Sequence, residues 1–196
     1  MKKVIILFLI LFLTSFLRLY RLGEISPSLD WDEASLGWNA YSILKTGTDE
    51  YGKAWPVSIR SFNDYKPPLY VYAAVPSIAI FGLNEFAVRF PSALAGILTV
   101  LLTFFLVKEL TRNRLLSYCV TALLAISPWS IQFSRGAFEA NFALFFFVLG
   151  AYLLLKFPLL SVFPFALSIY SYHSPRLVIP VFLFLYFILN FKTLIL

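Results

Sequence analysis

The sequence predicts an all-α integral membrane protein: a multi-span helical bundle with a long polar first loop. Two observations predict this fold class. Hydrophobic residues make up 60% of the 196 residues, and the mean hydropathy is +0.82. The apolar residues also gather into runs that short polar turns separate, which is typical of membrane-spanning helices and not of a soluble core.

Six of the apolar runs are expected to span the membrane, for which about 17–25 residues are needed. The first run follows a basic start and resembles a signal peptide. Bulky residues stand where a cleavage site would need small ones, so we expect it to be uncleaved, with Arg18 and Arg21 reaching toward the membrane surface. The predicted spans are residues 4–20, 86–107, 115–131, 142–155, 158–172 and 177–191.

Residues 21–85 form the polar part of the chain, which we name the first loop, and we expect it to contain amphipathic helices. Asp30 and Glu33 form a capping-box pattern, and Gly47 is a typical helix end, so one helix is expected between them. The apolar run 69–81 has about 13 residues, too few for a span. We therefore expect an interfacial or re-entrant helix that belongs to the same loop.

The distribution of charge predicts the orientation, because short loops with an excess of Lys and Arg face the cytoplasm. If residues 69–81 do not span, one side carries seven basic residues and one acidic residue, and the other carries nine of each. The N-terminus is therefore expected in the cytoplasm. The first loop and the polar segments 134–141 and 170–176 are expected on the extracytoplasmic face of the cell membrane.

Composition argues against several other classes of protein. A single cysteine, Cys119, and a single histidine, His173, exclude a disulfide framework and a Cys- or His-rich metal site. The net charge of +6 comes from basic residues scattered between apolar runs, which indicates membrane topology and no nucleic-acid partner. No cofactor is predicted, although the carboxylates leave room for a divalent metal.

Three carboxylates in four positions follow the first span: Asp30, Asp32 and Glu33. Capping explains Asp30 and Glu33, and acidic residues in a first turn suit the helix dipole. Capping gives Asp32 no role. A carboxylate at a membrane surface can deprotonate an acceptor hydroxyl while neighbouring cations hold a phosphate leaving group. Asp32 is thus either a dipole partner or a catalytic base.

The candidate phosphate ligands each have a structural alternative. Lys66 precedes two prolines, and this point charge on a stiff backbone suits a lipid phosphate, but it could also be an interfacial lysine. Arg135 and Glu139 are four residues apart and could pair on one helix end.

Aromatic residues accompany the remaining candidates. Tyr170 and Tyr172 with Arg176 lie near a helix end, where an aromatic belt with an interfacial arginine is the alternative to a substrate site. Trp31 and Trp38 could stack on sugars or belong to the same kind of belt.

The order of these features resembles the N-terminal part of the GT-C glycosyltransferases, specifically the dolichyl-phosphate-mannose protein mannosyltransferase / aminoarabinose transferase-like family. The resemblance covers nearly the whole chain. No single motif is specific, but five in this order and topology are fairly specific together. The matching segments are Asp32-Glu33, Lys66-Pro67-Pro68-Leu69-Tyr70, residues 82–96 with the basic turn that follows, residues 134–139, and Tyr170-Ser171-Tyr172 with Arg176.

The resemblance implies transfer of a sugar, with inversion, from a polyprenyl-phosphate donor to a lipid, glycan or protein acceptor on the outer membrane face. Asp32 matches the family's catalytic base and Lys66 its contact to the donor phosphate. Glu139 stands where the family often has an aspartate. The further candidates are Glu33 and Glu139 for catalysis, Arg135 and Arg176 for the donor phosphate, and Asp30, Trp31, Tyr170 and Tyr172 for substrate contacts.

Two expectations remain beside this function. Members of the family usually have more spans, so we expect this chain to be the N-terminal part of a longer protein. The alternative function is a non-catalytic membrane subunit or a transporter fragment. A transporter would place ionisable residues inside spans, near the middle of the membrane. The centres of the six expected spans are nearly free of charge, which favours the enzyme.

Overall fold

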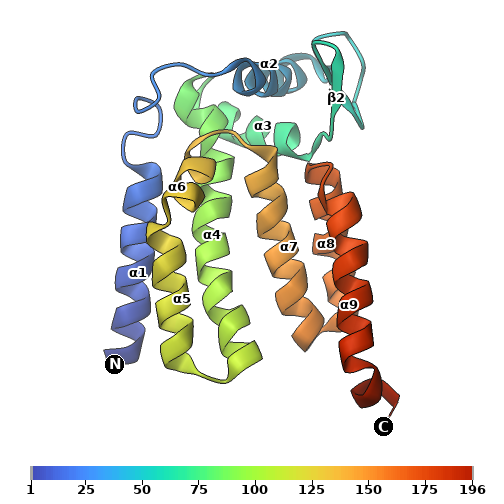
Figure 1. Cartoon of the computed structure of the whole chain (residues 1–196). Coiled ribbons are helices and arrows are strands. Elements are labelled where there is room, and N and C mark those ends of the chain that lie inside the picture. The colour runs from blue at the N-terminus through green and yellow to red at the C-terminus, as the bar shows by residue number, and fades with distance from the viewer. Residues whose placement is uncertain (1, 196) are drawn as a thin grey trace.

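The computed structural model describes residues 2–195, and the side chains of residues 4–190. Figure 1 shows an upright bundle of helices with a layer of α2, α3 and a short hairpin across one end. The elements in order are α1 (Lys2–Leu19), α2 (Trp31–Thr46), β1 (Ile59–Ser61), β2 (Asp64–Lys66), α3 (Leu69–Phe81), α4 (Glu85–Thr111), α5 (Arg114–Ile126), α6 (Pro128–Arg135), α7 (Glu139–Lys156), the 3-10 helix η1 (Pro158–Ser161), α8 (Val162–Ser171) and α9 (Pro175–Ile195).

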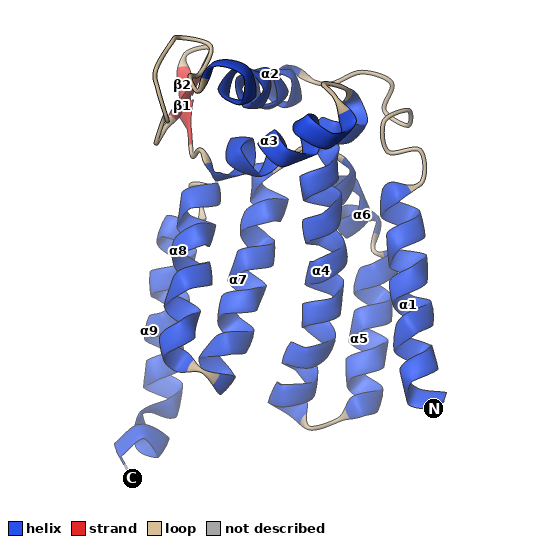
Figure 2. Cartoon of the chain, turned by 180° about the vertical axis from the view of Figure 1, so that it is seen from behind, coloured by secondary structure: helices blue, strands red, loops and turns tan. Residues whose placement is uncertain are grey.

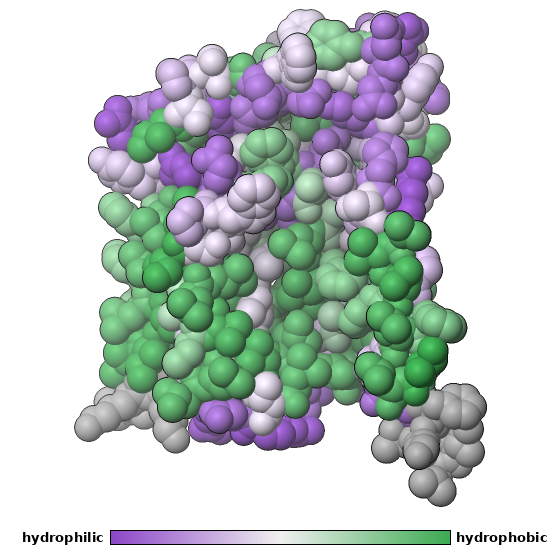
Figure 3. All heavy atoms as spheres, viewed as in Figure 1, coloured by the Kyte–Doolittle hydropathy of each residue, from purple (hydrophilic) through white to green (hydrophobic). Residues whose placement is uncertain are grey.

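The upright helices carry the apolar surface of the molecule. Among the described residues, α4 and α7 are long and apolar enough to cross a membrane, and α5 with α6 makes a third candidate if this bent pair is one span. α1 and α9 and the segment of η1 with α8 are shorter apolar helices. Figure 3 shows a broad apolar band between polar ends. The helical, apolar architecture agrees with the predicted class, whereas the number of six spans stays a prediction.

The predicted span over residues 115–131 is not one continuous helix in the structure, and that it crosses the membrane stays a prediction. The helix breaks at Ser127, and α5 and α6 are bent by 55° relative to each other. Pro128 has no N–H to continue the hydrogen bonds of α5, and it suits the first turn of a new helix. The Ser127 hydroxyl caps that helix by accepting from the N–H of Ser130.

Arg18 packs against this break, inside the bundle, so the expectation that its side chain reaches outward to the membrane surface is wrong. Its side chain is fully buried. The helix break leaves carbonyl groups of α5 without helical partners, and the guanidinium group satisfies them. It donates to the carbonyl oxygens of Leu124 and Ala125 at 3.4 and 3.0 Å and to the hydroxyls of Ser130 and Ser134 at 2.8 and 3.2 Å.

Helix α2 begins and ends where the sequence predicts. The Asp30 carboxylate accepts from the N–H of Glu33 at 2.8 Å, and the Glu33 carboxylate accepts from the N–H of Asp30 at 3.2 Å. This reciprocal pair is the predicted capping box. Gly47 ends the helix in the left-handed conformation with a φ of 73°, which glycine adopts without steric cost.

The rest of the first loop places two further elements beside α2. Strands β1 and β2 form an antiparallel hairpin, which the sequence pattern does not predict. Helix α3 covers the predicted residues 69–81 and lies across the ends of the upright helices in both views (Figures 1 and 2). The faces of α2, α3 and the start of α4 share one apolar core, which includes Leu36, Ala40, Ile43, Tyr70, Val71, Ala74, Ile78 and Val88.

Candidate functional site

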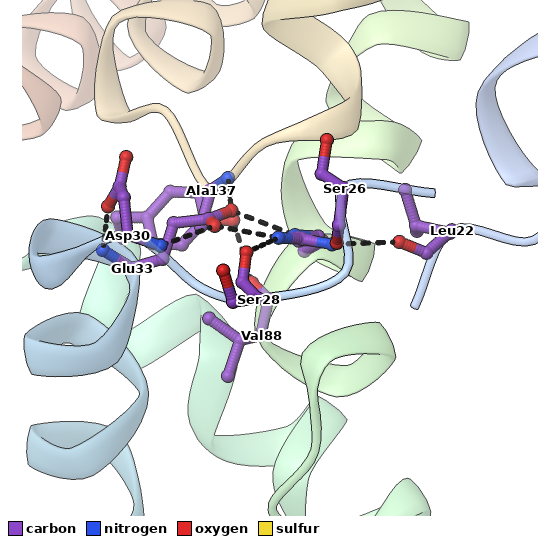
Figure 4. A network of polar contacts seen from close by, with 9 residues as sticks. Leu22, Ser26, Ser28, Asp30, Glu33, Val88 and Ala137 are labelled. Atoms are coloured by element: carbon purple, nitrogen blue, oxygen red, sulfur yellow. Dashed lines mark hydrogen bonds and ion pairs between the residues drawn. The ribbon is translucent and has the colours of Figure 1, made fainter. Parts of the chain in front are cut away.

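A buried ion pair joins Glu33 of α2 to Arg89 of α4. It ties the bundle to the layer of α2, α3 and the hairpin, which we name the polar layer, and Figure 4 shows the polar contacts around Glu33. The two side chains are 6% and 1% exposed, and two hydrogen bonds of 3.0 and 2.9 Å join them. Glu33 also accepts from the N–H of Ala137 at 2.7 Å, in addition to the capping bond from Asp30. Each carboxylate oxygen of Glu33 therefore accepts two hydrogen bonds.

Arg89 uses its remaining donors on the segment that enters α2. It donates to the carbonyl oxygens of Leu22, Ser26 and Ser28 at 3.2, 2.9 and 2.8 Å. All five N–H groups of the guanidinium are thus engaged. A buried ion pair is stable only when its remaining polar atoms find partners, and this one meets that condition. The pair fixes the start of α2 against α4 and against the α6–α7 turn.

These contacts favour a positioning role for Glu33 over the catalytic role that the sequence predicts. Its oxygens are buried and saturated, so they are not available to accept a proton from an acceptor. Sequence reasoning assigned no role to Arg89, although a signal was present. Arg89 is a charged residue near the start of an apolar segment, and such residues usually have a partner or a function.

Asp32 points to a different partner. Its Oδ1 accepts a hydrogen bond from Nζ of Lys66, at the end of β2, and the two groups form an ion pair. The Lys66 side chain is 9% exposed, whereas that of Asp32 is 52% exposed. The structure therefore brings together the predicted base and the predicted phosphate ligand, which lie 34 residues apart in the sequence.

Lys66 also lines a cavity of about 320 Å³ together with Tyr65, Tyr170 and Arg176. The cavity lies where the hairpin meets the end of α8 and the start of α9. Two of the three predicted phosphate ligands, Lys66 and Arg176, thus face one space. Two cations at one cavity can hold a phosphate group with charge-assisted hydrogen bonds.

Glu139 belongs to the same group of charges. It is the first residue of α7, and its carboxylate interacts electrostatically with Lys66 and Asp32. Its Oε1 is buried and has no hydrogen-bond partner among the described residues. Such a buried acceptor is costly unless it serves a purpose, which marks Glu139 as a group to be explained by function.

Arg135 is engaged elsewhere. It donates to the carbonyl oxygens of Leu17, Tyr20 and Arg21 at 3.1, 2.9 and 3.4 Å, so it caps the C-terminal end of α1. It does not line the cavity of Lys66. The alternative that Arg135 pairs with Glu139 on one helix is wrong, because α6 ends at Arg135 and α7 begins at Glu139.

The other predicted substrate contacts are dispersed. Asp30 is occupied by helix capping. Tyr172 does not line the cavity, and its ring lies 6.3 Å from that of His173. Trp31 is 75% exposed and faces a second cavity on α2. Within the described part of the chain, no three His, Cys, Asp or Glu side chains come close enough to hold a metal ion.

Comparisons with known proteins define the class. The model of the family described as dolichyl-phosphate-mannose-protein mannosyltransferase matches residues 5–170, and the chain belongs to this membrane-integral family. The resemblance recognised in the sequence is thereby confirmed. The family supports glycosyl transfer as the class of activity.

Two curated relatives are similar to parts of the chain. An uncharacterized protein of Aquifex aeolicus (strain VF5) is 36% identical over 90 residues, which cover 45% of this chain and 21% of that protein. The "Putative mannosyltransferase YkcB" of Bacillus subtilis (strain 168) is 28% identical over 139 residues, which cover 63% of this chain and 19% of that protein. The chain spans about a fifth of the length of these relatives. No solved structure matches it significantly.

Proposed function

We propose that this chain carries the active site of a glycosyltransferase that moves a sugar from a polyprenyl-phosphate donor to an acceptor hydroxyl or amine. The observation that carries the proposal is the ion pair of Asp32 with Lys66 at the edge of a cavity that Arg176 also lines. A carboxylate that can act as a base is thus paired with one of two cations that line a common cavity and can hold a phosphate. Membership of the mannosyltransferase family supports the same reaction.

In this proposal the donor phosphate lies in the cavity between Lys66 and Arg176. The bond between the sugar's anomeric carbon and the phosphate oxygen breaks during transfer, so negative charge grows on the departing phosphate. Fixed cations that face this charge stabilise the transition state more than the ground state. Lys66 is well placed for this role because its burial limits screening by water.

Asp32 is the proposed base. When the donor phosphate binds Lys66, the ion pair between Lys66 and Asp32 breaks. The half-exposed Asp32 carboxylate can then accept the proton of the acceptor. The acceptor oxygen or nitrogen then forms a bond to the anomeric carbon from the face opposite the phosphate, which inverts the configuration. Glu139 is a further carboxylate near these groups, and its charge attracts Lys66. Glu33 and Arg89 hold the helix start from which Asp32 projects.

A transporter fragment, the alternative function, gains support from one observation, the break between α5 and α6 beside the buried Arg18. Broken helices and buried charges mark substrate sites in transporters. The donors of Arg18 are used on carbonyl and hydroxyl groups of the protein itself. This arrangement gives Arg18 a structural role, so we favour the enzyme.

The experiment that tests the proposal compares Asp32→Asn with Asp30→Asn in purified full-length protein. Asp32→Asn keeps size and polarity but cannot take up the acceptor proton, so transfer from a polyprenyl-phosphate sugar should fall by about 10²–10⁴-fold. Asp30→Asn is the matched control, because asparagine caps a helix as well as aspartate does and activity should change little. Equal transfer rates for the wild type and Asp32→Asn would refute the assignment of Asp32 as the catalytic base.

A further inference from the structure

A second cavity lies on the face of α2 that points away from the bundle. Its volume is about 420 Å³, and four of the residues that line it are aromatic. The lining consists of Trp31, Ala34, Ser35 and Trp38 from α2 with Glu50, Tyr51 and Phe62 from the loops beside it. We name it the aromatic cavity.

The geometry of α2 places this cavity on the outer side of the polar layer. Successive residues of an α-helix are rotated by about 100°, so Trp31, Ser35 and Trp38 share one face. The opposite face carries Leu36 and Ala40, which pack into the core shared with α3. Since α3 lies between α2 and the upright helices (Figure 2), the two tryptophans point away from the apolar band. A membrane-interface belt therefore does not account for them.

The rings of the aromatic cavity are exposed to water. The exposed fractions are 75% for Trp31, 51% for Trp38, 53% for Tyr51 and 63% for Phe62. Scattered exposed aromatic residues are common, but several around one hollow mark a surface that binds something.

A fixed hydrogen-bond acceptor completes the cavity. Oε1 of Glu50 accepts from Nδ2 of the buried Asn39 at 3.1 Å, and the N–H of Glu50 donates to Oδ1 of Asn39 at 3.1 Å. This reciprocal pair holds Glu50 in place. Its Oε2 accepts no hydrogen bond from the residues that the structure describes, so it is free to accept one from a ligand.

This combination matches the chemistry of a sugar. A pyranose ring has an apolar C–H face that packs on a flat indole ring, and hydroxyl groups at its edge that donate to a fixed carboxylate. A peptide would more often use an unpaired strand edge or an apolar helix groove, whereas the cavity is made of exposed aromatic rings and one carboxylate.

We propose that the aromatic cavity binds sugar residues of a glycan acceptor. Trp31 directly precedes Asp32 in the first turn of α2, so a chain of two or three sugars can lie on the rings and bring its terminal hydroxyl to Asp32. The inference rests on the proposed function, because it assigns the acceptor of that reaction. It makes the acceptor a glycan and not a protein side chain.

The test uses the full chain purified in detergent and three probes: mannotriose, maltotriose and triacetylchitotriose. Saturation-transfer NMR titrations should show saturable binding of at least one trisaccharide. Trp38→Ala should weaken that binding about tenfold, and Glu50→Gln should also weaken it, because each removes one recognition element. Trp55→Ala is the matched control. Trp55 is a 72% exposed tryptophan of the first loop that does not line the cavity, and its removal should leave the dissociation constant unchanged.

Three results would overturn the inference: no trisaccharide binds, Trp55→Ala weakens binding as much as Trp38→Ala, or a serine- and threonine-containing peptide occupies the cavity in place of the sugars. Thermal melts followed by circular dichroism show that each variant is folded. Asp32→Asn should still bind the trisaccharide. Normal transfer by that variant, with sugar binding that depends on Trp38, would refute the proposed base and leave the sugar site standing.

Discussion

The pair of Glu33 and Arg89 offers the most quantitative test of how the site is held together. Arg89→Met replaces the arginine with an apolar side chain of similar length and so removes the charge and all five hydrogen-bond donors. Glu33 would then remain buried, at 6% exposure, without its counter-ion. Removal of one partner of a buried ion pair costs about 3–5 kcal/mol of unfolding free energy, and we expect a loss in this range.

The double variant separates the ion pair from the rest of the packing. Glu33→Gln alone leaves Arg89 without a counter-ion but keeps its bonds to the carbonyl oxygens of Leu22, Ser26 and Ser28. In Arg89→Met combined with Glu33→Gln, neither charge is left unpaired. Its loss of stability should therefore be smaller than the sum of the two single losses by at least about 1 kcal/mol.

The assay is denaturant-induced unfolding in mixed micelles, followed by the helical circular dichroism signal. Arg112→Met is the matched control. Arg112 pairs with Glu109 at the opposite end of the bundle, its side chain is 80% exposed, and Glu109 keeps a second partner in Lys156. This change should cost less than about 1 kcal/mol. If the losses for Arg89→Met and Glu33→Gln add within about 0.5 kcal/mol, the two residues do not act as a unit and the reasoning is refuted.

Two further predictions concern the donor and the orientation. Lys66→Ala should weaken the binding of the polyprenyl-phosphate donor by about 1.5–3 kcal/mol, the value of a charged hydrogen bond. Arg176→Ala should act in the same direction. If donor affinity and turnover are unchanged in Lys66→Ala, the lysine serves only as a partner of Asp32. In a Cys119→Ser background, cysteines at the exposed positions Asn63 and His173 should react with an impermeant maleimide from outside the cell. A cysteine at Asn113 should react only after permeabilisation. The reverse pattern would place the site on the cytoplasmic face.

The features that were predictable from the sequence are those fixed by neighbours in the chain. The capping box of Asp30 and Glu33 and the end of α2 at Gly47 depend on residues within a few positions of each other, and both are as expected. The short apolar helix α3 follows from its flanking prolines and Gly82. Strands β1 and β2 have three residues each, too few for an alternating pattern to be recognised.

The features that were missed depend on contacts between distant segments. Pro128 was visible in the sequence, but nothing nearby shows that Arg18, more than 100 residues earlier, satisfies the carbonyl groups at the break. In the same way, the capping pattern explains why Glu33 is acidic, but not that Arg89 and the N–H of Ala137 share its oxygens. The residue types for a site could be read from the sequence, whereas their partners could not.

The first turn of α2 explains why two adjacent carboxylates have different environments. Neighbouring residues in a helix point about 100° apart, so Asp32 and Glu33 cannot face the same surroundings. Glu33 turns inward, where Arg89 neutralises it and the helix start becomes rigid. The Asp32 side chain then extends from a fixed backbone toward Lys66 and the cavity. It is half exposed, and a phosphate can compete with it for Lys66, the one cation that it binds. In the proposed reaction, this difference lets one carboxylate position the site while the other is free to take up a proton.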